Sequence, residues 1–128
     1  FPGHSVIATS IFCCDEFTED AGATRFVPGS HHLRRHPVSG EGESEAVAVA
    51  APAGSIILWD GAMWHGNCPR SLVGERVVLH LTCNRQNVRP IESYIGIDPE
   101  VLRRNPPEFA GLLGLTDRWE RREMVRDS

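Results

Sequence analysis

Residues 5–14 read SVIATSIFCC, a run rich in β-branched and aromatic residues that predicts a buried strand. Residues 76–83, RVVLHLTC, predict a second strand of this kind. Between them, glycine- and proline-rich turns separate three shorter runs that also predict strands, namely residues 24–27, 46–51 and 55–60. Short strands joined by such turns are typical of a sandwich or barrel. We therefore expect a mainly β fold.

Composition narrows the class of protein. The 128 residues are 41% hydrophobic and 23% charged, which suits one globular domain. A net charge of −4 lacks the basic excess of a nucleic-acid-binding protein, so no nucleic-acid partner is expected. No apolar run approaches the roughly 18 residues of a membrane span. The chain starts at Phe1 and has no signal-peptide pattern, so we expect a fragment or processed part of a longer product.

The four cysteines do not form a C-x-x-C pair, which disfavours zinc-ribbon and thioredoxin-like folds. Cys13 and Cys14 are adjacent and would point to opposite faces of a strand. We interpret all four as free thiols of a reducing compartment, which makes a cytoplasmic location the expectation.

The C-terminal part of the sequence changes character. Asp98 followed by Pro99 is a helix-starting pair, and Asn105-Pro106-Pro107 repeats the pattern before residues that end at Gly114. Residues 117–126 form a third, strongly charged helical candidate. We therefore expect residues 1–97 to form a β core and residues 98–128 a helical C-terminal extension.

Two residues are the best candidates for chemistry. His65 follows a predicted strand and stands beside Gly66, which lets a ligand approach closely. Arg76 comes eleven residues later, at the start of the last strand, and its guanidinium could clamp a carboxylate through two hydrogen bonds. Taken alone, His65 could equally be a structural, hydrogen-bonded histidine.

Three blocks of sequence give this pair a context. Residues 17–31, FTEDAGATRFVPGSH, resemble the acidic turn and PGSH segment of the phytanoyl-CoA dioxygenase family. Residues 54–66, from GSIILWDG to WHG, are similar to the segment of that family that carries its distal histidine, and Arg76 has the spacing of its co-substrate arginine. The tail over residues 97–115 is also similar, so the resemblance covers nearly the whole chain in the same order.

The resemblance implies a partial double-stranded β-helix of the cupin or jelly-roll type. It also implies an oxygenase that hydroxylates a small organic substrate while it decarboxylates 2-oxoglutarate, with Fe(II) held by two histidines and one carboxylate. On this basis His65 matches the distal iron ligand, and Arg76 matches the residue that binds the far carboxylate of 2-oxoglutarate. Ser30 and His31 match the PGSH turn near the mouth of the site, without a ligand role.

The chain departs from the family in one respect. The other two iron ligands belong to an H-x-D motif, yet no histidine in this chain is followed two positions later by an acidic residue. We therefore expect the chain to represent the C-terminal part of the oxygenase, to bind neither Fe(II) nor 2-oxoglutarate alone, and to leave its status as an enzyme open. The alternative is a non-catalytic cupin-like binding or assembly module without a metal site. In either case exposed sheet edges could pair in a homodimer.

Other residues are weaker candidates. His31, His32 and His36 cluster, but neighbouring Gly29, Pro37 and two arginines favour a loop over a metal site. Asp15 and Asp60 are predicted turn residues. His80 shares a strand face with Arg76, and we favour a packed histidine over a substrate contact. Trp59 and Trp64 are expected in the core or in a pocket wall. A cupin enzyme with another metal ranks last, because only His65 is convincingly placed.

Overall fold

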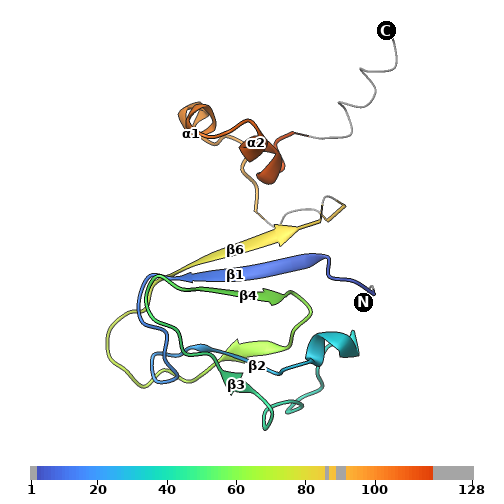
Figure 1. Ribbon diagram of the computed structural model, residues 1–128, viewed down its shortest axis with the longest axis vertical. Coiled ribbons are helices and arrows are strands. Elements are labelled where there is room, and N and C mark those ends of the chain that lie inside the picture. The colour runs from blue at the N-terminus through green and yellow to red at the C-terminus, as the bar shows by residue number, and fades with distance from the viewer. Residues whose placement is uncertain (1–2, 86, 89–91, 117–128) are drawn as a thin grey trace. The chain divides into compact units, whose positions relative to one another are not determined.

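The computed structural model describes residues 3–85, 87–88 and 92–116 of the chain. Residues 3–88 of this set contain the strands (Figure 1). They are β1 (Ile7–Cys13), β2 (Thr24–Phe26), β3 (Val47–Ala48), β4 (Ile56–Asp60), β5 (His65–Asn67) and β6 (Val78–Asn84). A one-turn 3-10 helix, Ser30–Leu33, follows β2.

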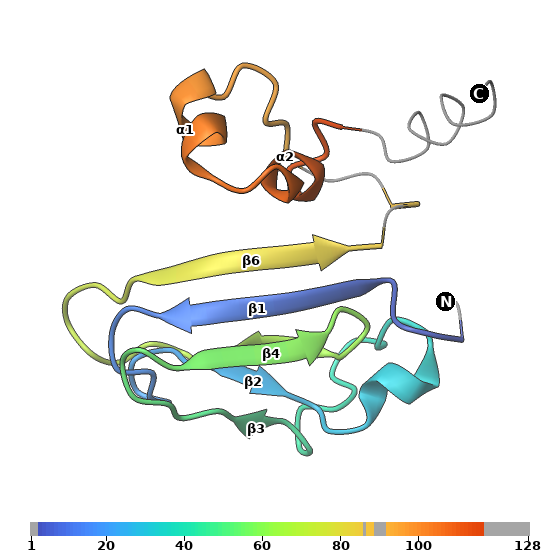
Figure 2. The ribbon, with the colours of Figure 1, turned by 45° about the horizontal axis from the view of Figure 1, so that its top comes forward.

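The strands form two antiparallel sheets, in the orders β4-β1-β6 and β3-β2-β5. Figure 2 shows β6, β1 and β4 of the first sheet side by side, with β2 and β3 beyond β4. The chain crosses between the sheets repeatedly, because β1, β4 and β6 belong to one and the intervening strands to the other. This arrangement confirms the predicted mainly β fold, a partial jelly roll of the double-stranded β-helix type.

The core lies between the two sheets. In β1, the alternate residues Thr9, Ile11 and Cys13 are buried, as expected for a strand with one face toward the core. Trp59 of β4 meets Phe26 of β2 edge to face, with 5.1 Å between ring centroids. Such aromatic pairs contribute about 1 kcal/mol beyond the area that they bury. This contact joins one sheet to the other.

Several elements differ in extent from the prediction. The strand predicted over residues 46–51 is reduced to Val47–Ala48, with an isolated bridge from Ala51 to Phe17. The stretch 30–44, predicted as a loop throughout, begins with the 3-10 helix. The last strand starts at Val78 rather than at Arg76. In each case the apolar pattern located the segment correctly, and backbone pairing set where it ends.

Residues 89–128 form a second compact unit, of which residues 92–116 are described. It contains the helices α1 (Pro99–Arg104) and α2 (Glu108–Leu112). Asp98 caps α1 as predicted, because its carboxylate accepts the backbone N–H of Glu100. The second cap was predicted wrongly: α2 is preceded by Pro107, and Asn105 instead donates its side-chain amide to the Val101 carbonyl of α1.

The third predicted helix, residues 117–126, lies outside the described residues. Within the described ranges no helix is both long and apolar enough to cross a membrane. The boundary predicted between residues 97 and 98 stays a prediction.

Candidate functional site

His65 is the first residue of β5 and pairs with Phe26 of β2. Its ring lies between the sheets, 5.5 Å from the Trp59 ring and 6.1 Å from the Phe26 ring, between centroids. Nδ1 lies 2.8 Å from the carbonyl oxygen of Met63. A carbonyl can only accept, so Nδ1 carries the proton and Nε2 keeps its lone pair. His65 is exposed, so its ring is accessible to a ligand.

Ser30 connects the PGSH turn to the strand of His65. Its hydroxyl donates to the Val27 carbonyl at 2.7 Å and accepts the backbone N–H of Trp64 at 2.8 Å. The side chain is 2% exposed, so water cannot replace either bond. Val27 also donates its own N–H to the Trp64 carbonyl. The PGSH turn therefore fixes the backbone of the residue that precedes His65.

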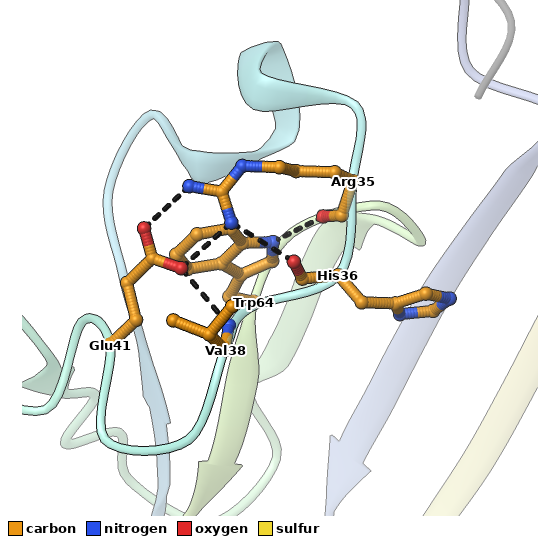
Figure 3. Close-up of polar contacts among 5 residues, drawn as sticks. All are labelled: Arg35, His36, Val38, Glu41 and Trp64. Carbon is orange, nitrogen blue, oxygen red and sulfur yellow. Dashed lines mark hydrogen bonds and ion pairs between the residues drawn. The ribbon is translucent and has the colours of Figure 1, made fainter.

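A loop of residues 35–46 packs against the Trp64 indole (Figure 3). The indole N–H of Trp64 donates to the Arg35 carbonyl at 2.8 Å, and the Arg35 guanidinium lies 5.1 Å from the indole ring centroid. Gly42, at a φ of 82°, approaches so closely that a Cβ would stand 2.9 Å from Val27 Cγ2. Residues of this loop and of β5, His65 among them, line a cavity of about 360 Å³.

A bidentate ion pair between Arg35 and Glu41 stabilises the same loop. The Arg35 guanidinium donates to both carboxylate oxygens of Glu41, at 2.7 and 2.5 Å, and the backbone N–H of Val38 donates to one of them (Figure 3). These hydrogen bonds, that of Arg35 first, lower the pKa of Glu41 to about 2. The hydrogen bond to Glu41 likewise raises the pKa of Arg35.

Arg76 precedes β6, and its guanidinium carbon lies 4.5 Å from the ring centroid of buried Phe17. The Asp15 carboxylate accepts the backbone N–H of the next residue, Val77, at 2.7 Å. Arg76 lines a second cavity, of about 510 Å³, together with Asn67 from β5. Burial raises the pKa of the nearby Cys13 thiol, and the charge of Arg76 partly opposes this. His65 and Arg76 thus line two different cavities.

Comparison with known proteins identifies the family. The family model for phytanoyl-CoA dioxygenase (PhyH) matches residues 2–71, more than half of the chain. The chain belongs to this family. His65 falls within the matched residues, and Arg76 lies beyond them.

Among curated relatives of this PhyH-family chain, dioxygenase cdmA of Talaromyces verruculosus is 30% identical over 102 residues, which are 77% of this chain and 33% of the relative. The uncharacterized protein Rv1501 of Mycobacterium tuberculosis is 28% identical over 113 residues, 88% of this chain and 41% of the relative. The chain thus spans less than half the length of these relatives. The solved structure of AviO1 from Streptomyces viridochromogenes shares its fold, with a TM-score of 0.59, 20% identity and coverage of 70% and 45% of the two chains.

Of the remaining candidates of the PhyH-family chain, Trp59 contacts the His65 ring, and His36 and Trp64 line the same cavity as His65. Among residues 3–85, 87–88 and 92–116, no three His, Cys, Asp or Glu side chains are grouped to hold a metal ion. The rings of His31 and His32 contact each other, with 3.9 Å between centroids and 39° between planes. Asp60 accepts the backbone N–H of Ala62 at 2.8 Å, which is the predicted turn role. All four cysteines are free, Cys13 and Cys68 in the interior.

Sequence reasoning missed two functional features. The first is the Ser30 link, which joins residues 34 positions apart. A serine after Pro-Gly signals a turn, but not which distant N–H its hydroxyl will accept. The second is the docking of the 35–46 loop on Trp64, which depends on the small size of Gly42. A glycine in a polar stretch could have suggested a close approach, but not its target.

Proposed function

We propose that the chain supplies the distal iron-binding histidine and the co-substrate arginine of an Fe(II)/2-oxoglutarate-dependent oxygenase of the PhyH family. In such an enzyme the iron provides oxygen-activating redox chemistry: one atom of O₂ enters the organic substrate, and the other oxidises 2-oxoglutarate to succinate and CO₂. In this proposal His65 is one of three protein ligands. The H-x-D pair is contributed by a part of the full polypeptide outside these 128 residues.

The hydrogen bond between His65 Nδ1 and the Met63 carbonyl, at 2.8 Å, carries the proposal. Histidines that bind metals nearly always donate their second ring N–H to a carbonyl or carboxylate, which fixes the tautomer and orients the ring. His65 has this arrangement, which leaves Nε2 as the ring nitrogen that could bind a metal. The described residues fit one iron ligand and leave the set of three incomplete.

Arg76 suits the co-substrate role because no carboxylate among the described residues pairs with its guanidinium. Its recorded contact is the Phe17 ring, which holds the planar group from one face and leaves its N–H edges for a ligand. An arginine edge matches a carboxylate through two parallel hydrogen bonds. The reaction would then need no further cation at this end of 2-oxoglutarate.

The test compares the 128-residue chain with the protein expressed from its complete reading frame. We expect the longer protein to bind Fe(II) and 2-oxoglutarate anaerobically, with the visible absorption band of the ternary complex, and the 128-residue chain to bind neither. His65→Ala in the longer protein should abolish the band, whereas His32→Ala, at an exposed position, should preserve it. A complete reading frame without an upstream H-x-D, or a His65→Ala variant that binds iron normally, would contradict the proposal.

The second candidate is a cupin-like binding module without a metal. It is favoured by the fact that the described residues hold no group of three His, Cys, Asp or Glu side chains that could bind a metal ion. The same titration distinguishes the two, because such a module would leave both proteins without iron while both remain folded.

A further inference from the structure

Polar side chains of β6 face the core side of the sheet, and apolar side chains face outward, which is the reverse of the usual pattern. His80 pairs with Ile11 and Val78 with Cys13, and both partners are buried. Directly paired residues share a face, so His80 and Thr82 lie on the inner side of the sheet. The alternate residues Leu79 and Leu81 are 56% and 57% exposed on the outer side. Strands normally direct the apolar set inward, so this inner face is suited to a polar occupant.

His80 lies against the indole that also contacts His65. Its ring stacks on the Trp59 ring with 6.0 Å between centroids and 18° between planes. Trp59 lies on β4, which β1 separates from β6 in the sheet. Its side chain therefore reaches over β1 to make this contact. The same indole lies 5.5 Å from the His65 ring. Two imidazoles, one from each sheet, therefore flank one buried side chain.

The His80 ring remains available to a ligand. It is exposed, and within the described part of the chain its nitrogens have no hydrogen-bond partner. The contact of Arg76, two residues before β6, with buried Phe17 places its guanidinium on the inner side as well. The inner positions of β1, β4 and β6 carry no acidic residue. This surface therefore presents N–H donors without a competing carboxylate, which favours an anionic ligand.

We propose that His80 is a ligand-binding residue whose imidazole donates a hydrogen bond to a carboxylate of the 2-oxo acid on the inner face of the β4-β1-β6 sheet. This inference rests on the proposed function and extends it. Arg76 would hold one carboxylate, and His80, four residues or about 13 Å of extended strand further on, would contact the end nearer to His65. Stacking on Trp59 fixes the plane of the imidazole and hence the direction of its N–H groups.

The experiment measures 2-oxoglutarate binding by calorimetry in the protein from the complete reading frame, with Mn(II) in place of Fe(II) so that no turnover occurs. His80→Phe keeps a ring to stack on Trp59 and removes the donors. Because a hydrogen bond to a charged group is lost, we expect Kd to rise about tenfold or more. His80→Gln keeps an N–H donor and should stay within about threefold of the native Kd. His32→Phe is the matched control and should leave Kd unchanged.

A second measurement separates binding from folding. Labelled-histidine NMR should show the His80 ring resonance shifting with saturation on addition of 2-oxoglutarate, while that of His32 stays fixed. If His80→Phe binds 2-oxoglutarate with native affinity, or if the His80 resonance does not shift, the His80 assignment is wrong and the proposed function stands. If the native protein binds no 2-oxoglutarate at all, the proposed function fails and the His80 assignment fails with it.

Discussion

Ser30→Ala should destabilise the β unit by about 2 kcal/mol. The substitution removes the hydroxyl that donates to the Val27 carbonyl and accepts the Trp64 N–H, in a side chain that is 2% exposed. The Val27 carbonyl keeps a second donor, the N–H of residue 30 itself, at 3.2 Å. The Trp64 N–H loses its acceptor inside the protein, which costs about 1–3 kcal/mol. The loss of the Val27 bond adds up to about 1 kcal/mol.

The assay is urea unfolding of the 128-residue chain followed by tryptophan fluorescence, with equal slopes required for the comparison. For a unit of this size, 2 kcal/mol lowers Tm by roughly 10 °C. Ser71→Ala is the control, because that hydroxyl donates to Asp20 at an exposed site, and its effect should stay within about 0.5 kcal/mol. Hydrogen exchange of the Trp64 amide should accelerate only in Ser30→Ala. Equal stability of the two variants, with native protection of that amide, would refute the reasoning.

Three further predictions concern the loop, a close contact and the thiols. The pKa of the Glu41 carboxyl should be near 2 by carbon NMR and should rise toward 4.5 in Arg35→Gln, where the Val38 N–H still donates to this carboxylate. Because the folded-state pKa is lowered, the ion pair's contribution to stability is present above about pH 4.5 and is lost as the pH falls toward 2. Gly61→Ala should lower the free energy of unfolding in urea by about 1–3 kcal/mol, because the new Cβ would stand 2.9 Å from Ile7 Cβ. Gly66→Ala is the control and should lower it less, because the nearest atom, Arg25 Nε, is 3.9 Å away. Equal losses of stability in the two variants would contradict the close contact at Gly61. Cys14 and Cys83, both exposed, should react with a thiol reagent in the folded chain, and Cys13 and Cys68 only on unfolding, as mass spectrometry of the labelled peptides can check.

Much of the fold could be predicted because its strands have a clear chemical pattern. The long β1 and β6 lie in runs rich in β-branched and other apolar residues, and both were located to within two residues. The short strand β5 could not be predicted, because His-Gly-Asn has no strand preference of its own. It becomes a strand because β2 offers a partner through Thr24, Arg25 and Phe26. Pairing of this kind depends on distant residues, which local patterns do not describe.

The candidate site divides in the same way. His65 and Arg76 could be singled out from spacing and resemblance, since each lies in a distinctive local motif. The Met63 carbonyl that fixes the His65 tautomer could not be predicted, because any residue type has a backbone carbonyl and the sequence does not show which one a side chain will contact. Strand parity placed His80 on one face with Arg76, but the packed histidine favoured from the sequence was wrong, because the residue is exposed. Its contact with Trp59 required the sheet order, since the two residues lie on strands separated by β1.

The packing between the sheets connects the core to the proposed site. His65 belongs to one sheet, whereas Arg76 leads into β6 of the other, so no single element fixes the distance between them. The Phe26–Trp59 contact spans the two sheets, and the same indole touches both His65 and His80. Because cores are closely packed and yield little, we expect a smaller side chain at residue 59 to alter the positions of both imidazoles as well as to lower stability.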